Sequence, residues 1–392
     1  MSRQSQSPLG ASITLAELED DPHPVLAALR EREPVSLVPA LGGWLVTRYD
    51  LALHVMRDTA AFTVDDPRFS TSRVVGPSML SLDGDEHVRH REPFGAPFRP
   101  VAVRERFAQP LADHAEHLLD GLEGSGRAEL RRSFAGPLAA FAMTRALGLE
   151  PDEVATVLEW YDAIVAAVTD ITAGHPAPQT GKDAFRRLRE RLMEVIDAGA
   201  GGASSLLAAA AAGSELTPDQ IVSNAGVLLF GGIETTEGMI ANAILHLLER
   251  PDQLLRVREE SGLLGTAIEE SLRLEPAAAM VDRYATENRE LEGETIARGD
   301  LVHVSIAGAN RDPAVFHQPD RFDLDRANAR RHLTFAHGPH VCVGVHLARL
   351  EARIALSALV RRFPTVRLDP DRPTSVRGLV FRKPSSLNAA WD

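Results

Sequence analysis

A long apolar helix in the middle of the chain limits the possible folds more than any other feature. Residues 217–220 read Thr-Pro-Asp-Gln, a capping box with Pro at the first helical position, and Pro251 marks the end. The helix predicted between them has about 33 residues, or roughly 50 Å at 1.5 Å per residue. Its middle is apolar on nearly every face, so we expect it to be buried and to cross the whole molecule.

The rest of the pattern predicts a chain that is mainly α with a minor β region. Further helices are expected over residues 49–58, 86–148 (with breaks), 151–170, 181–198 and 344–362. Strands are expected as a hairpin over 34–48, over 281–306 and over 370–392. Loops or irregular backbone are expected over 63–84, 199–204 and 307–340.

One domain accounts for this order of elements. Residues 1–12 are expected to be disordered and residues 13–392 to form a single domain. Its β-rich part comprises about 13–85, 281–306 and 370–392, and the remainder is helical. The 44% hydrophobic content is enough for a substantial core.

The net charge and the N-terminal sequence limit the classes of function that we expect. The net charge of −13 argues against nucleic acid as a partner, because phosphate binding needs a basic surface. The first residues lack the apolar region of a signal peptide, and no uninterrupted apolar run reaches about 18 residues, so no membrane anchor is expected. A single cysteine excludes intramolecular disulfides, and we expect a reducing cytoplasm.

That single cysteine, Cys342, lies in a segment shaped to present a thiolate. Gly338 and Gly344 allow tight turns on either side of it. Leu347 and Leu350 begin a helical pattern after it, so the sulfur lies just before a helix N-terminus, where an anion is stabilised. A buried apolar thiol, a nucleophile, a redox thiol and a metal ligand are all compatible with this pattern.

Polar residues interrupt the apolar helix at Gly231-Gly232, and Glu234 and Thr235 follow directly. Buried polar groups are costly without partners. One interpretation is a kink, with Thr235 bonded to a carbonyl one turn earlier and Glu234 paired with a distant Arg. The other is a functional acid and hydroxyl. Glu270 and Arg273 share a helix face at a spacing of three, which alone indicates only a surface pair of ~0.3–0.5 kcal/mol.

Residues 335–349 resemble the haem-binding signature of the cytochrome P450 family. The resemblance rests on a Phe seven residues before Cys342, a Gly four before, a His two before and a Gly two after. It implies that the Cys342 thiolate ligates haem iron, the only metal expected. It also implies that Phe335 shields the sulfur, Gly338 lets the loop approach the porphyrin, and His340 binds a propionate. Ala336 stands where many members carry Gly.

The same resemblance extends to two more motifs. Glu234 and Thr235 resemble the acid–alcohol pair of the family and would deliver protons, although many members have Asp in place of Glu. Glu270 and Arg273 resemble the E-x-x-R element, in which Arg321 would add a second guanidinium. That cluster would have a structural role in locking the irregular segment that precedes the cysteine.

Separate sets of residues would bind the haem propionates and line the substrate pocket. His87 and Arg91 match an H-x-x-x-R pattern, and Arg283 matches another propionate arginine, so that with His340 there are four candidate donors. Three apolar segments, namely 63–84, 227–230 and 277–281, would line a hydrophobic pocket, and the hairpin near Leu379 would add to it. The candidate pocket residues are Val227, Leu228, Phe230, Ala278, Met280, Val281 and Leu379. Core packing is the alternative for Leu228 and Met280.

The resemblance implies the family fold, a triangular prism of helices around a buried haem b. The expected protein is a cytoplasmic bacterial monooxygenase of secondary metabolism. It would insert one oxygen atom of O₂ into a hydrophobic small molecule, by hydroxylation or epoxidation. Electrons would come from a separate ferredoxin or flavodoxin with an NAD(P)H reductase. The alternatives are an H₂O₂-dependent peroxygenase, which usually has Arg-Pro at the acid–alcohol position, and a non-catalytic haem sensor or carrier.

Overall fold

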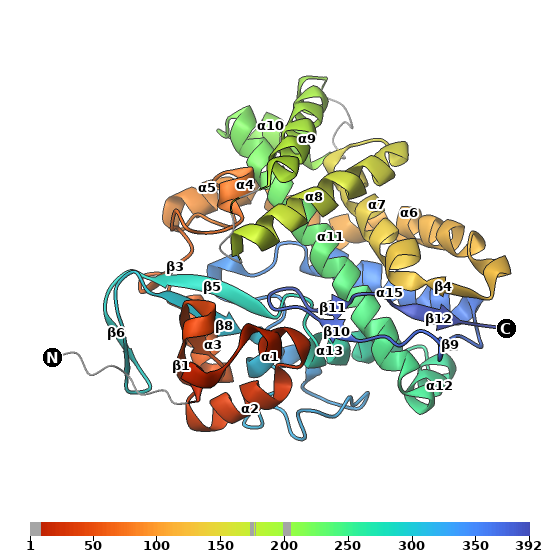
Figure 1. Ribbon diagram of the computed structural model, residues 1–392. Coiled ribbons are helices and arrows are strands. Elements are labelled where there is room, and N and C mark those ends of the chain that lie inside the picture. Colours follow the sequence, from red (N-terminus) through yellow and green to blue (C-terminus); the bar gives the residue numbers. More distant parts are fainter. Residues whose placement is uncertain (1–8, 173–175, 177, 199–204) are drawn as a thin grey trace. The chain divides into compact units, whose positions relative to one another are not determined.

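A computed structural model describes residues 9–172, 176, 178–198 and 205–392. The chain forms two compact units, each built from separate stretches of sequence (Figure 1). Unit 1 comprises residues 1–64, 241–342 and 370–387, and unit 2 comprises residues 65–240, 343–369 and 388–392. The mainly helical class with small sheets is confirmed.

The N-terminal segment is more ordered than predicted. Residues 1–8 lie outside the described part of the chain, but Gly10–Ser12 forms a turn of 3-10 helix and Gly10 is buried. The backbone N–H groups of Leu9 and Gly10 donate to the carboxylate of Glu33 over 3.2 and 3.1 Å. The expected disorder is therefore wrong for residues 10–12, because a carboxylate distant in sequence satisfies their backbone.

A five-stranded sheet forms the centre of unit 1, in the order β1-β2-β8-β5-β3. The predicted hairpin is confirmed, since Val35 pairs with Val46 in antiparallel register, and β2 then pairs in parallel with β8. Gly43 is needed at that junction, because a Cβ there would lie 2.5 Å from the carbonyl oxygen of Leu301. The strands are β1 (Val35–Val38), β2 (Gly43–Val46), β3 (Phe62–Thr63), β5 (Met280–Ala285) and β8 (Leu301–Ser305).

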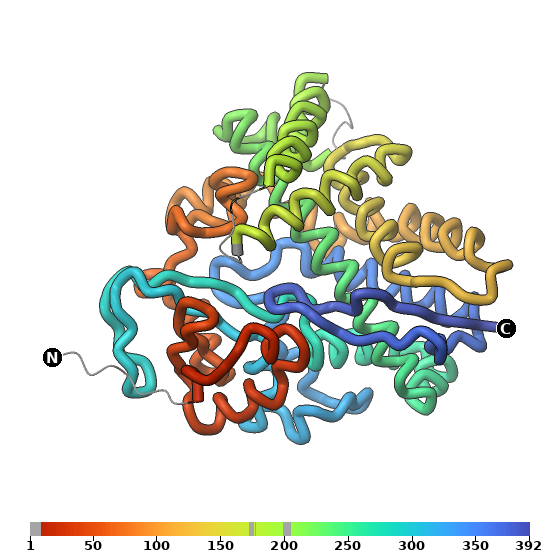
Figure 2. Tube along the Cα trace, in the orientation of Figure 1, coloured from red at the N-terminus to blue at the C-terminus, as the bar shows by residue number. Residues whose placement is uncertain are grey.

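Helices and two small hairpins complete unit 1, and Figure 2 traces them through the red, teal and dark blue parts of the chain. The hairpins are β6 (Arg289–Leu291) with β7 (Glu294–Ile296), and β10 (Val376–Arg377) with β11 (Lys383–Pro384). The helices are α1 (Leu15–Asp20), α2 (His23–Arg32), α3 (Tyr49–Arg57), α12 (Pro251–Glu259), α13 (Leu263–Leu274) and α14 (Ile306–Ala309).

Unit 2 is largely helical. Its helices are α4 (Ser72–Val75), α5 (Gly84–Gly95), α6 (Pro100–Asp120), α7 (Gly136–Leu147), α8 (Val154–Thr172), α9 (Gln179–Asp197), α10 (Leu206–Gly213) and α15 (Val345–Arg362). Three short strands form a sheet in the order β4-β12-β9, namely β4 (Arg127–Glu129), β12 (Asn388–Ala390) and β9 (Arg367–Leu368). Strand β4 was not predicted, because it has three residues and pairs with the distant C-terminus.

The long central helix is confirmed as α11 (Pro218–Leu248). Thr217 and Gln220 form the predicted capping box, through contacts of 3.0 and 3.3 Å. The α-helix runs through Gly231-Gly232 without ending, so these glycines do not stop it. Gly232 instead permits close packing on α7, since a Cβ at this position would lie 2.3 Å from the sulfur of Met143.

Other segments follow the prediction in outline. Most of 307–340 is irregular, and the predicted loop at 199–204 lies outside the described residues. None of the helices in the described part of the chain is long and apolar enough to cross a membrane.

Candidate active site

The loop that carries Cys342 is held in a tight conformation within unit 1. The N–H of Cys342 donates to the carbonyl oxygen of Phe335 over 2.8 Å, and the cysteine is exposed. Ala336 has a φ of 56° and Gly338 a φ of 76°. A Cβ at Gly338 would lie 2.6 Å from the carbonyl oxygen of Met56, so only glycine allows this approach to α3. The predicted need for tight turns is confirmed at Gly338.

Hydrogen bonds with little exposure to solvent anchor the start of this loop to α13. Thr334 donates from Oγ1 to the carbonyl of Leu272 over 2.7 Å. The amide side chain of Asn310 donates to Thr334 over 3.0 Å and accepts from the N–H of Leu333 over 2.7 Å. Sequence reasoning missed this anchor, because the groups come from three segments without a local signal.

A second anchor is the buried cluster around Glu270. Arg273 donates to its carboxylate from Nε over 2.8 Å, as predicted from the spacing of three. The second guanidinium belongs to Arg326, whose Nε donates to Glu270 over 2.8 Å. The prediction of Arg321 is wrong, since its side chain is exposed and its main-chain carbonyl accepts from Arg273 and Arg326. A backbone turn, in which the N–H of Arg326 donates to the carbonyl of Asp323 over 3.2 Å, precedes the buried side chain of Arg326.

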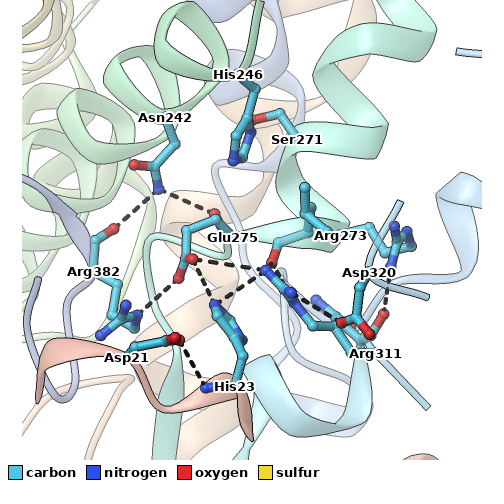
Figure 3. A network of polar contacts seen from close by, with 12 residues as sticks. Asp21, His23, Asn242, His246, Ser271, Arg273, Glu275, Arg311, Asp320 and Arg382 are labelled. Atoms are coloured by element: carbon cyan, nitrogen blue, oxygen red, sulfur yellow. Dashed lines mark hydrogen bonds and ion pairs between the residues drawn. The ribbon is translucent and has the colours of Figure 1, made fainter. Parts of the chain in front are cut away.

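Figure 3 shows a further buried network at the end of α13. The carboxylate of Glu275 is bonded to Nε2 of His23 from α2 and to Nε of Arg382, each over 2.8 Å. Asn242 donates to the carbonyls of Glu275 and Arg382 over 3.1 and 3.0 Å. Burial favours the neutral acid, but the hydrogen bond from His23 and the charges of Arg382 and Arg311 outweigh it and lower the pKa of Glu275 to about 2.

Glu234 and Thr235 lie on α11 in unit 2. Thr235 donates from Oγ1 to the carbonyl of Gly231 over 2.6 Å, the back-bond expected from the kink interpretation. Glu234 is buried and accepts a hydrogen bond from the phenol of Tyr161 on α8. Burial, with the negative charges of Glu234 and Glu237 nearby, raises the pKa of Tyr161 well above its usual value. Sequence reasoning missed Tyr161, because 73 residues separate it from Glu234.

The four candidate propionate donors are divided between the units. His87 and Arg91 lie one turn apart on α5, and His87 is buried. Arg283 on β5 is also buried and donates to the carbonyl of Asp282 over 2.7 Å. His340 ends a turn of 3-10 helix and is half-buried. Gly344 precedes the first residue of α15, which confirms the predicted helix start.

The candidate pocket residues are also divided. Those on α11 are buried in unit 2, namely Val227, Leu228 and Phe230. In unit 1, Met280 and Leu379 pack in a core with residues of α1 and α2. Val281 packs against a second core in the same unit, and Ala278 is half-buried. The cavity beside Met280 and Leu379 has a volume of about 20 Å³, which is room for a single water. This supports core packing for Met280.

Comparisons with known proteins show which family this chain is similar to. The family model for "Cytochrome P450" matches residues 200–387. The chain is 32% identical to the biotin biosynthesis cytochrome P450 of Bacillus subtilis (strain 168), over 92% of this chain and 93% of the relative. It is 35% identical to cytochrome P450 monooxygenase PikC of Streptomyces venezuelae, over 89% and 85%. The crystal structure of P450BioI in complex with an acyl carrier protein ligated to hexadec-9Z-enoic acid covers 95% of this chain and 99% of its own, with 29% identity and a TM-score of 0.84.

Proposed function

Because the chain belongs to the cytochrome P450 family, it is a haem-dependent monooxygenase that acts on small molecules, and we propose that Cys342 supplies the thiolate ligand of its haem iron. The observation that carries this proposal is the geometry of the cysteine loop. The loop presents the chain's single cysteine at an exposed position, with its N–H held by Phe335.

The residues of this loop fit a haem. A thiolate is a soft donor that suits iron in a haem, and the tight turn at Gly338 brings the backbone of the loop against the backbone of α3. His87, Arg91, Arg283 and His340 would hold the propionates, and Phe335 would shield the sulfur. When bound, the haem supplies O₂ activation, which electron donation from a thiolate favours.

Glu234 and Thr235 would deliver protons during the reaction. Thr235 uses its own proton in the bond to Gly231, so its oxygen presents lone pairs and can accept a hydrogen bond from water. Glu234 is buried and lies next to it in the helix. A buried carboxyl in this place can release a proton to that water and take up another, which is general acid–base chemistry.

The substrate is a hydrophobic small molecule, and Val227, Leu228 and Phe230 would line its pocket from α11. A separate ferredoxin or flavodoxin with its reductase would supply electrons, and the cytoplasm would be the compartment.

The absorption spectrum of the reduced protein exposed to CO tests the ligand. We expect a red-shifted, thiolate-type Soret band in the wild type and its loss in Cys342→His. A histidine-type band in the folded wild type, or an unchanged thiolate-type band in Cys342→His, would show that another residue ligates the iron.

A further inference from the structure

Tyr161, on α8 in unit 2, lies near the carboxylates of Glu234 and Glu237 on α11. Its phenol donates to Oε2 of Glu234, and its side chain is 2% exposed. The negative charges of Glu237, one turn further along α11, and of Asp162, the next residue of α8, also raise the pKa of Tyr161. Burial keeps the phenol in its neutral form, so Tyr161 remains a hydrogen-bond donor across the working pH range.

Glu237 has different partners from Glu234. It is fully buried and lies 3.3 Å from Nε of Arg131 and 3.7 Å from Nη1 of Arg132. A Cβ at Gly136 would lie 2.9 Å from its Oε1, so the glycine at the start of α7 makes room for this carboxylate. The two arginines lie in a turn of π-helix, Arg131–Ala135, a feature often found at functional sites.

The polar residues around Glu237 extend to the protein surface. Arg132 also pairs with Asp162 over 3.1 Å, and both side chains are about half exposed, at 48% and 52%. Polar groups therefore extend from solvent at Asp162 and Arg132 to the buried Glu237. The charge of Glu237 in turn influences the phenol of Tyr161, which is bonded to Glu234. Inside a helical unit, such a polar set is costly unless every member has partners.

We propose that Tyr161 is a positioning residue for Glu234. Its phenol fixes the rotamer of the carboxylate, ties the acid of α11 to α8, and joins it to the polar cluster of Asp162, Arg132 and Glu237 that opens to solvent. Without the phenol, Glu234 has several rotamers and delivers protons from only some of them. The proposal rests on the proposed proton-delivering function of Glu234.

Two measurements on the holoenzyme test the catalytic consequence. Tyr161→Phe keeps the ring and removes one O–H group. We expect product formed per electron pair to fall roughly fivefold, the effect of one net hydrogen bond, and the solvent isotope effect on turnover to rise. Tyr49→Phe is the matched control, because it removes the phenol that donates to the carbonyl of Arg331 over 2.7 Å, in unit 1. Glu234→Gln and the double variant with Tyr161→Phe complete the set.

Comparison of these variants distinguishes a failure of the positioning role of Tyr161 from a failure of the proposed function of Glu234. If Glu234→Gln reduces coupling and the double variant is no worse, Tyr161 acts through Glu234, as proposed. If Glu234→Gln reduces coupling and Tyr161→Phe behaves like Tyr49→Phe, the positioning role is overturned and the proposed function stands. If Glu234→Gln leaves coupling intact, the proposed function of Glu234 itself fails.

A spectroscopic measurement tests the contact without turnover. The chain has three tyrosines, so uniform labelling with fluorotyrosine gives three ¹⁹F resonances. The resonance absent from Tyr161→Phe belongs to Tyr161. We expect it to shift in Glu234→Gln while the other two stay in place, whereas three unchanged resonances would overturn the proposal. If Tyr161→Phe is too unstable to purify, Tyr49→Phe and the remaining tyrosine variant assign the third resonance by elimination.

Discussion

Nε of Arg326 donates to Oε1 of Glu270 over 2.8 Å, although 56 residues separate them in the sequence. Nε of Arg273 donates to Oε2 of the same carboxylate, and both Glu270 and Arg273 are fully buried. This cluster joins α13 to the irregular segment that leads into the cysteine loop. A buried carboxylate between two guanidiniums is costly to break, because each partner left behind is an uncompensated buried charge.

Arg326→Met should therefore lower the free energy of unfolding by about 3–5 kcal/mol. Arg321→Met is the matched control, since that side chain is exposed, and it should change stability by less than about 0.5 kcal/mol. Urea unfolding of the two holoproteins measures both values. Equal losses in the two variants would contradict the assignment of Arg326.

Gly338→Ala should destabilise the cysteine loop more than a positive φ alone explains. Gly293 serves as the control, because it has a similar φ of 81° and open space around it, whereas a Cβ at Gly338 would meet Met56. We expect Gly293→Ala to cost about 1 kcal/mol and Gly338→Ala to cost about 1–3 kcal/mol more. Thermal unfolding and haem retained per protein would measure this, and similar losses in both variants would contradict it.

Ala336→Gly should stabilise the protein by about 1 kcal/mol, because Ala336 adopts the left-handed conformation that favours glycine. Ala348→Gly, the same change inside α15, should instead destabilise it by about 1 kcal/mol. Opposite shifts of the thermal midpoint are expected. A lower midpoint for Ala336→Gly would mean that the backbone at Ala336 is not strained.

Stability should fall in acid because of Glu275. Its pKa is about 2 in the folded protein and 4.5 in the unfolded chain, so the folded state binds the proton more weakly. The stabilisation of about 3 kcal/mol is fully present above pH 4.5 and is lost as the pH falls towards 2. Glu275→Gln should flatten this part of the pH–stability curve, and the exposed Glu31→Gln on α2 should not. An unchanged curve in Glu275→Gln would contradict the assignment.

Thr235→Ala should uncouple electron use from product formation, roughly tenfold, because it removes the oxygen that accepts a hydrogen bond from water. Thr235→Ser keeps that oxygen and should retain most of the coupling. Product and NADPH consumed, measured with a surrogate reductase, give the ratio. Full coupling in Thr235→Ala would remove the hydroxyl from the proposed mechanism.

Local signals in the sequence determined much of this protein. The capping box at Thr217 predicted the start of α11, and the hairpin around Gly43, the pairing of Glu270 with Arg273 and the tight turn at Gly338 were all predicted. Each depends on residues within a few positions of one another, where spacing and backbone preference decide the conformation. The cysteine motif likewise carried the family and the cofactor.

Only the tertiary structure decided the contacts between distant segments. It placed Arg326 where Arg321 was predicted, brought Tyr161 to Glu234, and packed Gly232 of α11 against Met143 of α7. It also paired β4 with β12 near the C-terminus. The physical reason is the same in each case. Which side chains meet across two packed elements depends on the angle and register of their packing, and spacing along either element does not encode these.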